Sequence, residues 1–156
     1  MAAGSLESWE YLASYPDLIN AFGTDVAAAA SHYNNFGAGE HRSISFDAWD
    51  YLASNNDLMN AFGTDVQKAA EHYMTNGRNE SRSFAFDAAS YLSANPDLAL
   101  RFGTDYDGAT QHYIGTGRFE MEQGLLPSFS TVFLSGIVSS FQLPALQEFD
   151  GALGFS

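Results

Sequence analysis

The stretch Phe22-Gly23-Thr24-Asp25 returns twice in this chain, as Phe62-Gly63-Thr64-Asp65 and as Phe102-Gly103-Thr104-Asp105. The copies lie 40 residues apart with no insertion between them, and residues 5–44 match residues 45–84 at 23 of 40 positions. Chance does not produce such agreement, so the chain contains an internal repeat. Repeats of this length are typical of proteins in which stacked units share one core.

Each repeat unit is expected to be helical. In the second unit, Phe46, Trp49 and Leu52 have the spacing of one helix face, which predicts a long first helix. The glycine of the repeated stretch is a typical helix end, and the Thr-Asp pair after it is a typical helix start. The next segment, from Val26 to Tyr33, predicts a further helix that ends at Gly37 and its counterparts. Each unit is therefore predicted to contain a long, a short and a medium helix.

These patterns predict an all-α fold: a short solenoid of three helical repeats followed by a C-terminal amphipathic helix. We divide the chain into a repeat region, residues 1–124, and a C-terminal segment, residues 125–156. The three units are residues 5–44, 45–84 and 85–124. Because stacked units bury aromatic faces that one unit cannot bury alone, we expect the repeated aromatic residues to be mostly core. They are Trp9, Trp49, Tyr11, Tyr51, Phe22, Phe62 and Phe102.

The composition argues against several classes of function. The 156 residues include 6 Lys and Arg against 19 Asp and Glu, which gives a formal charge of −13, and 46% of them are hydrophobic. So acidic a chain lacks the clustered cations that bind nucleic acid or an anionic membrane surface. The absence of cysteine excludes disulfides, thiolate metal sites and a cysteine nucleophile. The first ten residues lack the basic and apolar regions of a signal peptide, so we expect none.

The pattern YLxxNPDLxxxFGTD, followed by HYxxxGxxExR, resembles a recurrent helical repeat of large secreted or surface proteins of marine bacteria and cyanobacteria. That repeat often lies beside calcium-binding toxin-type repeats. The resemblance covers residues 5–122 and implies spacer or interaction modules without catalytic residues. It implies an extracellular, cell-surface or particle-associated location without a cleavable signal peptide, while a cytoplasmic location stays open. The third unit departs from the pattern, since Ala89 replaces Trp, and Glu122 replaces the arginine of Arg42 and Arg82.

The C-terminal segment follows a change in composition, because residues 123–147 carry no charge. Between Pro127 and Pro144, five apolar residues have the spacing of one helix face, which predicts an amphipathic helix. We assign these five as partner-binding residues: Phe129, Val132, Phe133, Ile137 and Phe141. Three roles stay open for the segment: a cap on the third unit, a docking element for a protein partner or a second copy, and membrane insertion. Membrane contact is the weakest of the three, because residues 128–143 are fewer than the ~20 that span a bilayer.

Three repeated histidines, His32, His72 and His112, are the candidate ligand-binding residues of the repeat region, together with Trp9 and Trp49. The competing interpretation of each histidine is a hydrogen bond to a neighbouring helix end or to a carboxylate. Successive units of a helical array lie on the order of 10 Å apart, so the three imidazoles cannot converge on one metal ion. We therefore predict no metal site in the repeats.

The repeated acids suggest calcium, but a structural explanation is stronger. Asp17 and Asp25 are typical helix-start residues, and Glu40 and Arg42 are expected to pair with a neighbouring unit. The stretch from Asp105 to Gly108 is only a fragment of a calcium-binding loop and occurs in one unit. We expect no cofactor beyond weak calcium binding by an acidic surface.

The sequence favours assembly over catalysis. It contains no nucleophile elbow, P-loop, zinc-protease motif or dinucleotide fingerprint. A catalytic site is unique, whereas this chain repeats its polar residues three times. We predict a non-enzymatic structural or adaptor protein of an extracellular, surface or particle assembly, with the repeats as scaffold and the C-terminal segment as contact. The alternatives are an ion- or small-molecule-binding repeat module and a peripheral membrane protein anchored by the C-terminal helix.

Overall fold

The computed structural model describes residues 1–126. These residues form helices joined by turns and short extended linkers and contain no strand, so the part of the chain that the structure describes is all-α. The predicted C-terminal helix and its five assigned residues, Phe129 to Phe141, lie outside the described residues.

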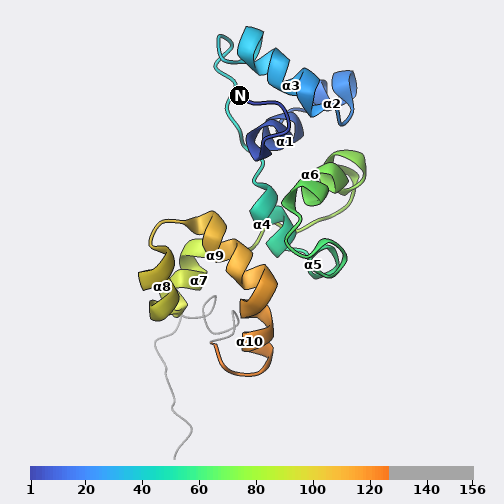
Figure 1. Ribbon diagram of the computed structural model, residues 1–156. Coiled ribbons are helices and arrows are strands. Elements are labelled where there is room, and N and C mark those ends of the chain that lie inside the picture. Colours follow the sequence, from blue (N-terminus) through green and yellow to red (C-terminus); the bar gives the residue numbers. More distant parts are fainter. Residues whose placement is uncertain (127–156) are drawn as a thin grey trace, which may run out of the picture.

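Three groups of three helices follow one another along the molecule (Figure 1). The first group is α1 (Leu6–Ala13), α2 (Pro16–Phe22) and α3 (Val26–His32). The second is α4 (Ala48–Ala53), α5 (Asn56–Phe62) and α6 (Val66–Thr75), and the third is α7 (Ala88–Ala94), α8 (Pro96–Phe102) and α9 (Tyr106–His112). Short turns follow the third helices: the π-helical turn Tyr33–Gly37 follows α3, the 3-10 turn Gly77–Asn79 follows α6, and the π-helical turn Tyr113–Gly117 follows α9. Helix α10 (Arg118–Glu122) is the last described helix.

The first helix of each unit is shorter than the hydrophobic spacing predicts. Asp47 accepts hydrogen bonds from the backbone N–H groups of Trp49 and Asp50, at 2.9 and 3.0 Å, and so starts α4 at Ala48. Phe46 therefore lies in the linker before the helix, although it is buried. The prediction of a long first helix that includes Phe46 is wrong, because an aspartate N-cap sets the helix start.

The predicted break within each unit is confirmed. Gly23, Gly63 and Gly103 follow the second helices with φ values of 62°, 58° and 57°, which a residue with a Cβ rarely adopts. Asp25 then caps the third helix by accepting hydrogen bonds from the N–H groups of Ala27 and Ala28. At this turn, the glycine of the repeated stretch thus ends the second helix and the aspartate starts the third.

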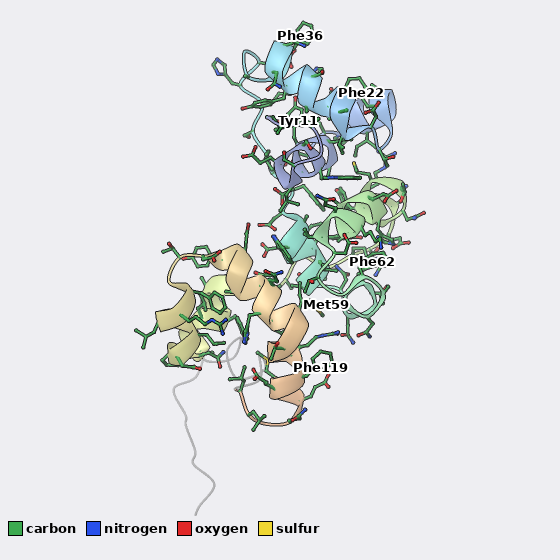
Figure 2. The ribbon with its side chains drawn as sticks, in the orientation of Figure 1. Tyr11, Phe22, Phe36, Met59, Phe62 and Phe119 are labelled. Atoms are coloured by element: carbon green, nitrogen blue, oxygen red, sulfur yellow. The ribbon has the colours of Figure 1, made fainter. Side chains whose placement is uncertain are left out.

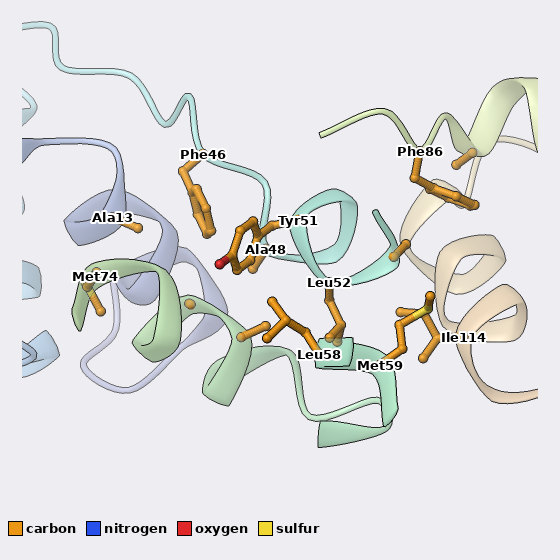
Figure 3. Close-up of a cluster of buried hydrophobic side chains, with 14 of the residues drawn as sticks. Ala13, Phe46, Ala48, Tyr51, Leu52, Leu58, Met59, Met74, Phe86 and Ile114 are labelled. Carbon is orange, nitrogen blue, oxygen red and sulfur yellow. The ribbon is translucent and has the colours of Figure 1, made fainter. Parts of the chain in front are cut away.

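Neighbouring units pack through the first helix of one and the third helix of the next. Helix α1 packs against α6, and α4 packs against α9. The apolar contact residues include Met74 and Ile114, which are 2% and 1% exposed, and Figure 3 shows Met74 facing α1 and Ile114 beside Met59. The corresponding residue of the first unit is Asn34, which instead exchanges hydrogen bonds with the amine and carbonyl groups of Met1. Apolar residues therefore occur at this position only where a preceding unit covers it.

Candidate functional site

A buried tyrosine–histidine pair is the polar centre of each unit. Tyr11, Tyr51 and Tyr91 are fully buried on the first helices. Their hydroxyl oxygens lie 3.0, 3.0 and 2.9 Å from the Nδ1 atoms of the histidines 21 residues later in the chain, His32, His72 and His112. Burial raises the pKa of Tyr51 to about 12 and also raises the pKa of the other two tyrosines. The hydroxyl groups are therefore protonated at neutral pH and serve as hydrogen-bonding groups.

The histidine of each pair also contacts the phenylalanine of the repeated stretch. The ring centroids of Phe22 and His32 are 5.9 Å apart, and those of Phe62 and His72 are 6.0 Å apart. Figure 2 shows Tyr11 and Phe22 within the first helix group, whereas Phe36 projects from its end. Each imidazole thus joins the first, second and third helices of its own unit.

The repeated glycine after each histidine makes room for the tyrosine hydroxyl. A Cβ built at Gly77 would overlap the Oη atom of Tyr51, and the same holds at Gly37 and Gly117 for Tyr11 and Tyr91. Close approach of a side chain to the backbone, and not a left-handed conformation, requires glycine here, because none of the three has a positive φ. Gly117 also fails to end its helix as predicted, since α10 follows it directly.

Each histidine has its hydrogen-bond partner within its own unit. Their partner is the tyrosine of the same unit, so the predicted hydrogen bond to a helix end or a carboxylate is wrong. Residues 1–126 contain no group of three His, Asp or Glu side chains that could hold a metal ion. Trp9 and Trp49, the other two candidates, are half-buried and pack against the core.

An arginine clamp, made of Arg42 in the first unit and Arg82 in the second, binds two carboxylates in each. Arg82 donates from Nη1 to Asp57 and from Nε to Glu80, and Arg42 donates in the same way to Asp17 and Glu40. Hydrogen bonds from Arg82 lower the pKa of Asp57, and Arg42 lowers that of Asp17 despite the opposing effect of burial. The clamp joins the second helix to the linker that follows the third, so it fixes the exit of the chain from each of these two units.

Five carboxylates gather where the units meet, and we name this group the acidic junction. It comprises Glu10, Asp47, Asp50, Asp87 and Asp107. The last four line a cavity of about 230 Å³ together with Tyr106 and Thr110. Glu10 does not line this cavity but lies beside Asp47, since its Oε1 atom accepts a hydrogen bond of 3.1 Å from the N–H group of Ala48.

Burial and the repulsion of neighbouring charges raise the pKa values of Glu10, Asp50 and Asp107 in the acidic junction. Burial raises the pKa of Glu10 to about 7, and the charges of Asp47 and Asp107 add to this effect. The pKa of Asp50 is raised to about 6 by burial and by the charges of Asp47, Asp87 and Asp107. The site can therefore take up protons near neutral pH, and its negative potential attracts cations.

The sequence analysis missed the acidic junction. Asp47 and Asp87 occupy one repeat position, and Glu10 and Asp50 occupy another, three residues later in each unit. This spacing was visible, but it is also the ordinary spacing of exposed residues at a helix start. Only the stacking of α1 on α6 and of α4 on α9 shows that side chains from successive units converge. Asp107, from the suspected loop fragment, belongs to this group, whereas Asp105 caps α9.

Comparison of the chain with protein-family models, with curated proteins and with solved structures gave no match. Among residues 1–126, no helix combines the length and the apolar character needed to cross a lipid bilayer.

Proposed function

We propose that this protein is a non-enzymatic structural or adaptor component of an extracellular, surface or particle assembly. In this proposal, the three units form a short solenoid that acts as an acidic scaffold. The C-terminal segment, residues 125–156, makes the contact with a protein partner or with a second copy of the chain.

One observation carries the proposal: the repeated polar residues are already engaged within the scaffold. The histidines bind the buried tyrosines, the two arginines bind carboxylates, and aspartates cap the helices. The folding of each unit therefore accounts for the repetition of these residues, which supports a structural role. A stacked array of similar units with one segment of different composition at its end is suited to assembly.

Light scattering after size exclusion tests the proposal with the full chain. We expect an assembly larger than the 16.9 kDa monomer that becomes monomeric when Ile137 and Phe141 are both changed to serine. The matched control changes Leu146 and Phe149 to serine, outside the assigned face, and should leave the assembly intact. A wild-type chain that stays monomeric at all concentrations would contradict self-assembly. Loss of helical circular dichroism in the first variant would identify the segment as a cap.

A further inference from the structure

The third helix of the second unit ends directly before the dipeptide Asn76-Gly77. Helix α6 ends at Thr75, and the N–H group of Asn76 makes the last backbone hydrogen bond of this helix, to the carbonyl of His72 at 2.8 Å. Asn76 has φ −131° and ψ −53°, which lie outside the helical region. The N–H group of Gly77 donates to no acceptor among residues 1–126. The nitrogen of Gly77 is therefore not held in a hydrogen bond.

The other two units differ at this position. The residues before the repeated glycine are Phe36 and Thr116, and each lies with its glycine inside a π-helical turn that continues the third helix. Asn76 is the one asparagine of the chain that a glycine follows. The second unit alone thus combines a carboxamide side chain, a following glycine and a helix end.

The Asn76 side chain can reach the nitrogen of Gly77. Asn76 is exposed, and its Nδ2 atom donates to Oγ1 of Thr75 at 3.1 Å. A five-membered ring closes when the Gly77 nitrogen bonds to Cγ of Asn76, and proximity favours such a step within one chain. Glycine has no Cβ that would shield this nitrogen. The guanidinium group of Arg78, which forms no ion pair in the described part of the chain, favours loss of the Gly77 amide proton through its positive charge.

We infer that Asn76-Gly77 is a site of spontaneous deamidation in the folded protein. Hydroxide removes the amide proton of Gly77, and the nitrogen then bonds to Cγ of Asn76. The Cγ–Nδ2 bond breaks, and the leaving nitrogen takes up a proton from water and departs as ammonia, which regenerates the hydroxide. Water then opens the cyclic imide at one of its two carbonyl carbons and leaves either aspartate or isoaspartate at position 76. Water is the only co-reactant, and nothing is oxidised or reduced.

Isoaspartate at position 76 changes the setting of Gly77. The main chain then runs through the former side chain, which adds one carbon atom to the backbone directly before Gly77. A Cβ built at Gly77 overlaps the Oη atom of Tyr51, so the backbone has little room to shift there. The hydrogen bond between Tyr51 and His72 should therefore weaken, and only in the second unit. This inference does not depend on the proposed function, because the reaction requires neither a partner nor an assembly.

Peptide mass spectrometry of the full chain, incubated at pH 8, tests the inference. The peptide that contains Asn76 should gain about 1 Da, because a hydroxyl group replaces an amino group, and its fragmentation should identify isoaspartate. Asn79 is the internal control, since it is exposed in the same linker, is followed by Glu80 and should keep its amide. Asn76→Thr, which introduces the residue found at position 116, should abolish the change without loss of helical circular dichroism.

A parallel incubation in urea shows whether the fold leaves this site open. We expect the native and the unfolded chain to deamidate at rates within about tenfold of each other, because no native hydrogen bond of the Gly77 N–H group has to open first. A native rate lower than this would overturn the inference, since the fold would then protect the site. Equal deamidation of Asn79 would also overturn it, because the reaction would then not depend on the following glycine.

Hydrogen–deuterium exchange measures the effect on the second unit. The isoaspartate form, separated from the unmodified chain by anion exchange, should exchange the amides of α4 at least about threefold faster than the variant Asn76→Asp does. That variant carries the same added charge on an unaltered backbone, so it is the matched control. Equal exchange in the two forms would show that the added backbone atom does not reach the Tyr51–His72 pair, and would overturn the proposed loosening of the unit.

Discussion

The middle and the third units have the same interior and different outer faces. Both bury a tyrosine that is hydrogen-bonded to a histidine. The following unit covers the outer face of α4, where Ala53 is only 4% exposed. At the end of this helix, the Ser54 hydroxyl accepts a hydrogen bond from the N–H group of Phe86. The matching residues on α7 are Ser93, which is exposed, and Ala94, which has no hydroxyl group. The repeat thus retains residues that hold one unit together and changes residues that hold two units together.

The largest expected effect comes from the shared interior. Gly77→Ala should lower the free energy of unfolding by about 2–4 kcal/mol, because its Cβ would overlap the Tyr51 hydroxyl and break the bond to His72. Gly117→Ala should cost a similar amount, since the same contact exists in the third unit. Urea denaturation followed by circular dichroism measures both.

Gly115→Ala is the control for these variants, because the nearest atom to its added Cβ, a methyl carbon of Thr64, is 3.9 Å away. We expect a change of less than about 0.5 kcal/mol. If Gly77→Ala were as stable as this control, the tyrosine–histidine pair would not be the centre of the unit.

Much of this interior was predictable from the sequence, and the reason is local. The glycine at positions 23, 63 and 103 and the aspartate two residues later act within one turn of chain, so their roles follow from backbone preferences alone. The partner of His72 was not predictable, because Tyr51 lies 21 residues away and reaches it only after three helices have packed. The acidic junction was even less predictable from the sequence, because it forms only when two units are in contact.

The second largest effect concerns the acidic junction and its response to pH. The pKa of Glu10 is raised from an ordinary value of 4.5 to about 7, so the folded state binds this proton more tightly than the unfolded state does. The free energy of unfolding should therefore be highest below about pH 5 and fall as the pH rises toward 7. Asp17 and Asp57 have lowered pKa values and act in the opposite sense, so stability should fall again below about pH 4.

The variant Glu10→Gln distinguishes the loss of stability toward pH 7 from the loss of stability below about pH 4. The amide oxygen of the glutamine can still accept a hydrogen bond from the N–H group of Ala48, but the glutamine side chain carries no charge. We expect a gain on the order of 1–2 kcal/mol at pH 8, after allowing for screening by solvent, and a flatter curve between pH 5 and 8. The control Glu71→Gln, on the exposed face of α6, should leave the shape of the curve unchanged. A wild-type curve that rises steadily from pH 5 to pH 8 would refute this account of the junction.

A smaller effect tests the outer faces directly by exchanging their residues. Ala53→Ser should cost about 1 kcal/mol, because its hydroxyl group is buried beneath the next unit. The reverse change in the third unit, Ser93→Ala, should alter the free energy of unfolding by less than about 0.5 kcal/mol, since the side chain is exposed. Equal effects at the two positions, measured by thermal and urea denaturation, would mean that the two faces are covered alike.

The smallest expected effect comes from the arginine clamp, which the second unit has and the third unit lacks. Asp57 pairs with Arg82 at 2.7 Å, whereas Asp97, its counterpart, pairs with no arginine among residues 1–126, and Glu122 stands at the arginine position. Asp57→Asn should cost up to about 1 kcal/mol, because the Asp57 side chain is 64% exposed and solvent screens its charge. Asp97→Asn should cost only about 0.3 kcal/mol, through its weaker interaction with the start of α8. In 1 M salt, which shortens the screening length to about 3 Å, the difference between the two variants should shrink. A difference that persists at high salt would show that Asp57 acts through hydrogen-bond geometry, and the absence of any difference at low salt would show that the clamp contributes no stability to the second unit.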